Sequence, residues 1–301
     1  MNYTTKFKNI AVIPNEQKDP TLQHTKNLID YLLAHGGNTN SICNIWMDES
    51  YRQKLGNYDA LNYVADETLY QSCDLLIALG GDATMLGVAA KASRFAKPVI
   101  GVNLGRVGYM SEIEPDEMHL FEQIFSGDFR VNERMMIDVV IIKSNGIAHQ
   151  AGTALNDAVI TNGVMARLIE IDLFADNVKI THYRADGVII ATPTGSTAYS
   201  MSAGGPIIDP NIECICVTPI CPHSLSSKPV IFSHDSVLEV RRNDSRDRHD
   251  TDVYLTVDGR TNVKLERDDV VRLTKSNFTA KLISVKNHGF FDVIREKISE
   301  S

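Results

Sequence analysis

The stretch Leu75-Leu76-Ile77-Ala78-Leu79-Gly80-Gly81-Asp82-Ala83-Thr84-Met85-Leu86 decides the fold. Its first five residues are continuously apolar, as in a strand that is buried on both faces of a parallel sheet. The two glycines lack Cβ atoms, so the backbone can turn sharply and approach a ligand closely. A helix is predicted to follow, and its N-terminal amides favour an anion at the turn. Tight turns without a ligand can have the same residues, so the rest of the chain must decide between the two interpretations.

Strand and helix signals alternate around this stretch, from residue 8 to about 115. Strands are predicted at residues 9–14, 43–47, 74–79 and 98–103, and helices at 20–35 and 115–126. Such alternation implies a parallel sheet with helices on its faces. Ligands bind beyond the carboxyl ends of the strands in these sheets. The glycine turn and the segment Asn103–Tyr109 both follow a predicted strand, so we expect them at the ligand-binding edge.

The pattern of apolar and polar residues changes after Gly127. Apolar and polar residues alternate in several short segments, as in half-buried strands, at residues 136–142, 168–174, 188–192, 237–240 and 253–257. The sequence therefore predicts an α/β N-terminal domain with a parallel sheet, followed by a mostly β C-terminal domain. We expect the α/β domain at residues 1–126 and the β-rich domain at 127–275. The C-terminal segment, 276–301, is expected to pack back on the N-terminal domain.

Composition limits the classes of partner. The 301 residues carry a formal net charge of −8, which argues against broad binding to nucleic acid. No apolar run reaches the roughly 18 residues of a membrane span, and no signal-peptide segment is present. Five cysteines do not suggest a disulfide framework, and Cys214, Cys216 and Cys221 with His223 lack the spacing of a zinc site. We therefore expect a cytoplasmic protein without a structural metal site.

The segment Arg184–Pro206 is the longest run of small and hydroxylated residues. A predicted strand leads into Thr192-Pro193-Thr194-Gly195-Ser196-Thr197-Ala198-Tyr199-Ser200, and a helix is predicted to begin near Ser196 or Thr197, which are good N-cap residues. The turn offers hydroxyls and backbone amides without bulk, and Tyr199 offers a flat face for a base or pyridine ring. These features suit a nucleotide, although an elaborate loop could have the same composition.

Two shorter motifs also carry chemistry. Asn156-Asp157 places an amide beside a carboxylate, and together they can donate to and accept from nucleotide hydroxyls and ring edges. Asp258-Gly259-Arg260 has the composition of a hairpin turn. The chain lacks the glycine-lysine loop of P-loop kinases and the glycine spacing of a standard dinucleotide fold.

Taken in order, these motifs resemble those of the NAD kinase family from about residue 8 to 290. The resemblance rests on Gly80-Gly81-Asp82, Asn156-Asp157, the stretch from Asp186-Gly187 through Ser200, Gly204-Gly205-Pro206, and Pro222-His223-Ser224-Leu225 with Pro229. The threonine-rich run is highly specific, whereas Gly-Gly-Asp also occurs in lipid kinases and phosphofructokinases.

The resemblance implies that the second domain binds NAD and that the active site lies in a cleft between the two domains. It implies transfer of the γ-phosphoryl group of ATP to the 2′-hydroxyl of the adenosine ribose of NAD, with Mg²⁺ or another divalent cation accompanying ATP. Asp82 becomes the general base or metal-organising carboxylate. The residues implied to bind NAD are Asp82, Ala83, Asn156, Asp157, Arg167, Arg184, Asp186, Thr197, Ala198, Tyr199, Ser200, Met201, Ser202 and Arg260. Those implied to bind phosphate are Gly80, Gly81 and Thr84.

One residue departs from the family pattern. Glycine commonly follows the aspartate of Gly-Gly-Asp, and this chain has Ala83 there. Alanine does not easily take a positive φ, so either the position does not need that conformation or the turn differs locally.

Three functions compete at this point. A lipid kinase of the diacylglycerol or sphingosine type shares Gly-Gly-Asp, but it is disfavoured by the run from Thr194 to Ser202. A non-catalytic NAD(P)-binding sensor shares the binding motifs, but it does not need Asp82. The family resemblance further implies a homo-oligomer, a dimer or a tetramer. ATP and polyphosphate as donors, NAD and NADH as acceptors, and feedback by NADP(H) all stay open.

Overall fold

The chain forms two compact units. The computed structural model describes residues 7–36, 43–56, 58, 60–105, 108–163, 168–224, 226–243, 252–287 and 289–299. Unit 1 is the chain up to Glu133 together with the residues from Ala280 onward, and unit 2 is Arg134–Thr279. Two strands, β6 (Arg130–Ile142) and β17 (Val270–Ser284), have residues in both units.

Unit 1 is built on a parallel sheet with the strand order β5-β4-β1-β2-β3. Lys281 and Leu282 of β17 pair with β5, also in parallel. The strands are β1 (Asn9–Pro14), β2 (Asn44–Asp48), β3 (Asn62–Val64), β4 (Leu75–Gly80) and β5 (Pro98–Asn103). The helices are α1 (Gln23–His35), η1 (Glu49–Tyr51), α2 (Arg52–Leu55), α3 (Asp66–Ser72), α4 (Asp82–Ser93), η2 (Met118–Leu120), α5 (Phe121–Ser126) and α7 (Phe290–Ser299).

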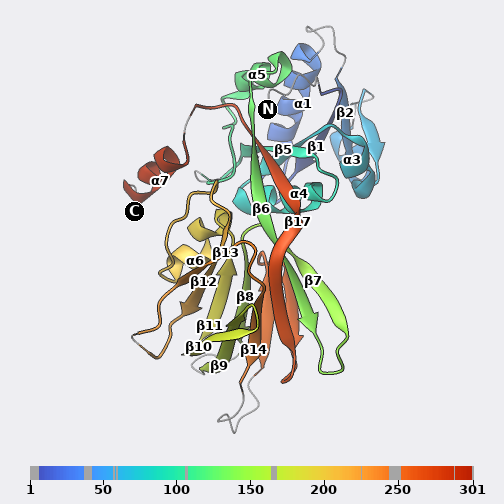
Figure 1. Ribbon diagram of the computed structural model, residues 1–301. Helices are drawn as coiled ribbons and strands as arrows, with labels where there is room; N and C mark the ends of the chain where they lie inside the picture. Colours follow the sequence, from blue (N-terminus) through green and yellow to red (C-terminus); the bar gives the residue numbers. More distant parts are fainter. Residues whose placement is uncertain are drawn as a thin grey trace. The chain divides into compact units, whose positions relative to one another are not determined.

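Helices cover both faces of this sheet, which explains why β4 is apolar at every position. Leu75, Ile77 and Leu79 belong to a core that includes residues of α1 and α5. Leu76 and Ala78, which point to the opposite face, are equally buried, and α4 packs against β4 and β5. Figure 1 shows α1 and α5 on one side of the strands and α3 and α4 on the other. A central strand covered on both faces must be apolar throughout.

Unit 2 is a pair of packed sheets. One contains six strands in the order β13-β12-β11-β8-β15-β16; in the other, β10, β9, β14 and β17 follow one another, β6 pairs with β17, and β7 pairs with β6. The remaining elements are β7 (Ala148–Ala154), β8 (Asp157–Asn162), β9 (Ile169–Ala175), β10 (Val178–Ala185), β11 (Gly187–Ala191), η3 (Thr194–Thr197), α6 (Tyr199–Ser202), β12 (Cys214–Ile220), β13 (Val230–Ser233), β14 (Leu238–Arg242), β15 (Val253–Val257) and β16 (Thr261–Leu265).

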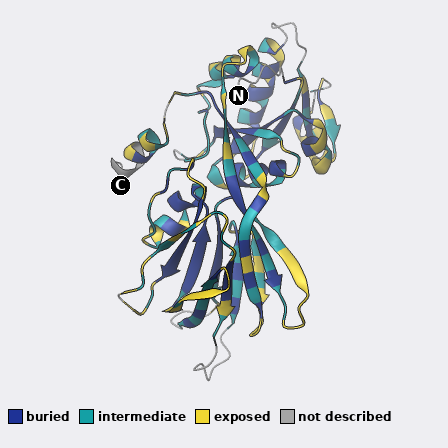
Figure 2. Cartoon of the chain, in the orientation of Figure 1, coloured by how far each residue is buried: buried dark blue, intermediate teal, exposed yellow. Residues whose placement is uncertain are grey.

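One apolar core joins the two sheets of unit 2. It contains Ile160 and Val188 from the six-stranded sheet and Ile171, Leu238 and Leu273 from the other. The strands β11 and β12 are buried along their whole length, whereas β10 has mostly exposed residues (Figure 2). The outer face of β11 is covered by the segment that follows it, since Ala203 packs against a cluster that includes Ile189 and Ala191.

The predicted fold class, an α/β N-terminal domain and a mostly β C-terminal domain, is confirmed by these two architectures. In the part of the chain that the structure describes, no helix is long and apolar enough to cross a membrane.

Three predicted elements differ in detail. The helix predicted at 115–126 is a 3₁₀ turn, η2, followed by the short helix α5. No α-helix begins at Ser196 or Thr197, because their hydroxyls donate back to the carbonyls of Pro193 and Thr194. The C-terminal segment predicted from residue 276 begins inside a strand, β17, which runs without interruption from Val270 to Ser284.

Candidate functional site

The glycine turn of unit 1 lies at the carboxyl end of β4 and at the start of α4. Gly80 and Gly81 are small for different physical reasons. A Cβ on Gly80 would lie 2.3 Å from Oγ1 of Thr84, so Gly80 makes room for that side chain. Among the described residues, no atom lies within 4 Å of the position that a Cβ on Gly81 would take. Gly81 therefore leaves space beside the N-terminus of α4, where an anion is favoured.

Asp82 is the first residue of α4, and its carboxylate is held by the backbone of a neighbouring loop. The Tyr109 amide donates to Oδ2 at 2.7 Å and the Met110 amide donates to Oδ1 at 3.1 Å. Gly108 permits this approach, because a Cβ there would lie 2.1 Å from Oδ1. An ionised carboxylate can accept about four hydrogen bonds, so two amides orient Asp82 and leave lone pairs for a substrate hydroxyl or a cation.

Ala83 takes a helical conformation. It is the second residue of α4, and it is not among the residues with a positive φ. Of the two possibilities that Ala83 raised, the structure supports the first: this position does not need the conformational freedom of glycine.

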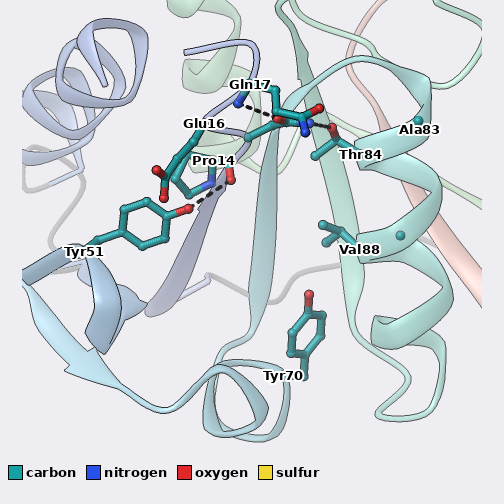
Figure 3. A pocket seen from close by; sticks show the side chains of 10 residues that line it. Pro14, Glu16, Gln17, Tyr51, Tyr70, Ala83, Thr84 and Val88 are labelled. Carbon is teal, nitrogen blue, oxygen red and sulfur yellow. Dashed lines mark hydrogen bonds between the residues drawn. The ribbon is translucent and has the colours of Figure 1, made fainter. Parts of the chain in front are cut away.

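A pocket of about 500 Å³ lies beside the turn in unit 1. Figure 3 shows its walls: Pro14 at the end of β1, Glu16 and Gln17 just after it, Tyr51 from η1, Tyr70 from α3, and Ala83, Thr84 and Val88 from α4. Nδ2 of Asn15 donates to Oγ1 of Thr84 at 2.7 Å, which joins the two sides of the pocket. The sequence analysis missed Asn15, although it follows a strand at the same edge of the sheet as the glycine turn.

Tyr51 gives this pocket an aromatic wall. Its hydroxyl donates to the carbonyl of Pro14 at 3.4 Å. Burial, with a smaller contribution from Glu16, raises the pKa of Tyr51 to about 12, so the hydroxyl stays protonated at neutral pH.

In unit 2, Asn156 and Asp157 lie at the start of β8, and a carboxylate from another strand connection holds their backbone. Oδ2 of Asp258 accepts the amide of Leu155 at 2.9 Å, and Oδ1 accepts the amides of Asn156 at 2.8 Å and Asp157 at 3.1 Å. The amide of Asp258 in turn donates to the carbonyl of Asp157 at 2.9 Å. The sequence predicted only a hairpin turn at Asp258; Asp258 and Gly259 do have positive φ, as a primed hairpin turn requires.

The threonine-rich segment also forms hydrogen bonds with the backbone of Leu155 and Asn156. Oγ1 of Thr192 donates to the carbonyl of Leu155 at 2.5 Å, and the Thr192 amide donates to the carbonyl of Asn156 at 2.8 Å. Gly195 packs against this carbonyl so closely that a Cβ would lie 2.1 Å from its oxygen. Residues far apart in the sequence therefore meet at Asn156.

Asp157 is buried, and the half-buried Asp258 is a neighbouring carboxyl group. Burial, and next the neighbouring charge of Asp258, raise the pKa of Asp157 to about 7. Burial also raises the pKa of Asp258, while its three amide bonds and the charge of Arg260 lower it. Because the Asp258 carboxylate accepts three N–H groups, which favour its ionised form, Asp157 is the one of the two that binds a proton more readily.

The predicted NAD loop divides into two kinds of residue. Thr197 and Ser200 are buried: Thr197 donates to the carbonyl of Thr194, and Oγ of Ser200 lies 3.0 Å from Oγ1 of Thr218. Tyr199 is 45% exposed, and Ser202 is also exposed. The buried hydroxyls stabilise the loop, and the exposed residues are available to a ligand. Ala198 and Met201 have intermediate exposure.

The remaining candidates lie on or near the edge of unit 2. Arg184 on β10 forms an ion pair with Glu170 at 3.3 Å. Asp186 joins two strands, since its amide donates to the Ile220 carbonyl and its carbonyl accepts the Asn162 amide. Arg260 ends the hairpin turn of Asp258 with an exposed side chain. Arg167 lies outside the described residues.

The cysteines do not assemble a metal centre in the part of the chain that is described, where no group of three or more histidine, cysteine, aspartate or glutamate side chains could hold a metal ion. Cys214 and Cys216 are buried on β12, and burial raises the pKa of both thiols. Cys221, just after β12, is exposed.

Comparisons with known protein families match both units. The family model for the ATP-NAD kinase N-terminal domain matches residues 10–129. The model for the ATP-NAD kinase C-terminal domain matches residues 155–285. Among curated proteins, an NAD kinase of Thermoanaerobacter sp. (strain X514) is 40% identical over 98% of this chain and 100% of its own length. An NAD kinase of Geobacter sp. (strain M21) is 35% identical over 97% of this chain and 98% of its own length.

Solved structures give the same result. The crystal structure of yeast NADH kinase complexed with NADH has a TM-score of 0.84 and 26% identity, and covers 99% of this chain and 89% of the yeast chain. The crystal structure of an NAD kinase from Archaeoglobus fulgidus in complex with ATP has a TM-score of 0.73 and 25% identity, and covers 98% of this chain and 100% of that one.

Proposed function

Because the chain belongs to the NAD kinase family, we propose that it transfers the γ-phosphoryl group of ATP to the 2′-hydroxyl of the adenosine ribose of NAD, giving NADP. The observation that carries this proposal is the geometry of Asp82. Its carboxylate is oriented by two backbone amides at the start of α4, beside the space that Gly81 leaves. Phosphoryl transfer depends mainly on positioning and charge neutralisation. The oriented carboxylate supplies the positioning, and the divalent cation that enters with ATP would neutralise the phosphate charge.

Asp82 acts in this proposal as the general base or as the carboxylate that organises the cation. As base, it accepts the proton of the 2′-hydroxyl while the ribose oxygen bonds to the γ-phosphorus. The bond from that phosphorus to the bridging oxygen breaks, ADP leaves, and the proton passes from Asp82 to solvent. A carboxylate in this role contributes a factor of about 10² to 10⁴ to the rate.

The donor enters as the complex of ATP with a divalent cation, which we expect to be Mg²⁺. Such cations bind through substrate phosphates and one or two carboxylates, so a separate protein cage is not needed. Asp82 is the carboxylate at the predicted phosphate site, which Gly80, Gly81 and Thr84 form at the N-terminus of α4. We place the adenosine part of ATP in the pocket lined by Tyr51, which is large enough for it.

The acceptor is bound mainly by residues of unit 2, with Ala83 of unit 1. Asn156 and Asp157 provide the donors and acceptors for the ribose and base, and the exposed ring of Tyr199 provides a surface for stacking. Ala83, Arg167, Arg184, Asp186, Thr197, Ala198, Ser200, Met201, Ser202 and Arg260 complete the proposed set.

The assay that tests the proposal incubates the purified chain with NAD, ATP and Mg²⁺ and measures NADP. NADP formation is the expected result. Phosphorylation of diacylglycerol or sphingosine instead would support a lipid kinase. Tight NAD binding without product would support a sensor. Polyphosphate and NADH are added in parallel arms, so the same experiment determines the donor and the acceptor.

We also propose a homo-oligomer in the cytoplasm. In the described part of the chain, β10 pairs only with β9, and this edge strand exposes 62% of Val178 and 42% of Ile180. The free backbone N–H and C=O groups of an edge strand can pair with another chain, although Lys179 and Arg184 on this strand oppose such pairing. The five free cysteines fit a reducing compartment. Light scattering of the purified chain measures the oligomer, and a monomer at all concentrations would contradict the proposal.

A further inference from the structure

We propose that Asp258 is a positioning residue for nucleotide binding, because its carboxylate fixes the backbone that carries Asn156 and Asp157. The inference rests on the proposed function, in which those two residues bind NAD. Three consecutive amides, from Leu155 to Asp157, donate to the Asp258 carboxylate at 2.8 to 3.1 Å. A single side chain therefore sets the orientation of three successive peptide units at the point where β8 begins.

The arrangement requires a carboxylate in particular. Both oxygens are used, Oδ2 by one amide and Oδ1 by two. Asparagine would replace one of these acceptors with an NH₂ group, which would face a backbone donor instead. Hydrogen bonds to an ionised acceptor are stronger than those to a neutral one, so loss of the charge weakens the remaining bonds as well.

The backbone of Asp258 is specialised for this contact. Its φ is +50°, a conformation that aspartate and asparagine tolerate better than most residues. The turn also donates the Asp258 amide to the Asp157 carbonyl at 2.9 Å, so the contact runs in both directions. A hairpin turn that served only to reverse the chain would not need to bind another segment at four points.

Asp258 also controls the charge of its neighbour. The groups that act on this pair are Asp157, Asp258 and Arg260, and the Asp258 charge is the second cause, after burial, of the raised pKa of Asp157. Removing that charge therefore shifts the ionisation of Asp157 toward lower pH.

The test compares Asp258→Asn with the wild-type chain at 15 °C, where a partly destabilised variant stays folded. We expect the KM for NAD and the Kd for NAD from calorimetry to rise about tenfold, as for the loss of one charge-assisted bond. The KM for ATP and kcat should change less than about threefold. The pH at which the NAD affinity changes, through the ionisation of Asp157, should move toward acid.

Asp269→Asn is the matched control. Asp269, like Asp258, is a carboxylate of unit 2 that holds a turn: it is buried, and it accepts hydrogen bonds from the amide of Glu266 at 2.9 Å and from Nζ of Lys143 at 2.7 Å. The Asp269→Asn substitution should lower the melting temperature without altering the NAD affinity. If both variants lose stability and neither loses NAD affinity, Asp258 is only structural. An equal rise of both KM values in Asp258→Asn would also overturn the proposal, since it would indicate general loosening.

Thr192 provides a second pair of variants if Asp258→Asn does not fold. Thr192→Val removes the hydroxyl that donates to the Leu155 carbonyl, and Thr192→Ser keeps it. The valine variant should bind NAD several-fold more weakly than the serine variant; equal affinities would overturn the inference. If the wild-type chain itself binds no NAD, the proposed function fails instead, so the two failures are distinct.

Discussion

Asp82 in unit 1 and Asp258 in unit 2 both accept hydrogen bonds from backbone amides, but the two carboxylates have different roles. Each carboxylate accepts consecutive backbone amides, two for Asp82 and three for Asp258. Asp82 is half-buried beside the open space at Gly81, and its remaining lone pairs can meet a substrate. Asp258 lies in a hairpin turn, where its bonds fix other residues. The same bonds to backbone amides can therefore orient a carboxylate for catalysis or let a carboxylate hold another segment in place. The exposure of the carboxylate to a substrate distinguishes the two roles.

The sharpest test of this comparison is Asp82→Asn. We expect kcat for NADP formation to fall by about 10² to 10⁴, because asparagine cannot accept the ribose proton. The melting temperature should change by only a few degrees, because Asp82 is not buried. Steady-state kinetics and thermal unfolding measure the two effects. Activity within a few-fold of the wild type would remove Asp82 from the mechanism.

Asp157→Asn tests the raised pKa of Asp157 through the pH dependence of the free energy of unfolding. A carboxyl with a folded pKa of about 7 and an unfolded pKa of about 4 binds its proton more tightly when folded. Its contribution to stability is present below about pH 4 and is lost as the pH rises to about 7, a change of about 3 to 4 kcal/mol. Asparagine cannot ionise, so the variant should lose this part of the pH dependence.

Urea unfolding at pH 5 and pH 8 measures that change, and the wild-type chain should lose more stability on going to pH 8 than the variant does. An identical loss in both proteins would show that Asp157 is ionised throughout. Asp82→Asn serves as the control, since it removes a carboxylate that is not buried.

Gly195→Ala tests how rigidly the backbone at Asn156 is held by the segment that packs against it. The added Cβ would lie 2.1 Å from the carbonyl oxygen of Asn156, and backbone atoms cannot move aside cheaply. Overpacking of this kind costs about 1 to 3 kcal/mol of unfolding free energy. Denaturant unfolding should detect the loss, and Gly81→Ala, where the new methyl group meets open space, should show almost none. Equal stability of the two variants would mean that the contact at Gly195 relaxes freely.

Gly108→Ala should have a small effect on stability and a clear effect on activity. Its Cβ would lie 2.1 Å from Oδ1 of Asp82, which is the end of a side chain and can rotate away. The displaced carboxylate should lower kcat about tenfold with little change in melting temperature. If kcat is unchanged while the melting temperature falls, the amides of Tyr109 and Met110 do not position Asp82 for catalysis.

The features that follow from local sequence were predictable. The apolar run before Gly80 identified a strand covered on both faces, and the Asp-Gly pair at 258–259 identified a hairpin turn. Ala83 could be questioned from sequence, but only the helical start of α4 shows that alanine fits there.

The features that depend on distant contacts were not predictable. The role of Asp258 depends on amides about a hundred positions earlier in the chain, and no spacing rule connects them. The 3₁₀ turn at Thr194–Thr197 was missed because Ser196 and Thr197 are equally suited to capping a helix and to bonding back to it. Asn15 was missed because its partner, Thr84, lies on a helix that follows a different strand.

The exposed Cys221 has a practical consequence. Burial raises the pKa of the four other thiols, at Cys43, Cys73, Cys214 and Cys216, so few of them are thiolates at neutral pH. A maleimide fluorophore should therefore react first at Cys221 without any cysteine being removed by mutation. Cys221 lies two residues before His223, whose amide bonds to the carbonyl of Arg184. The native chain thus offers an attachment point for an optical reporter close to a residue of the proposed NAD site.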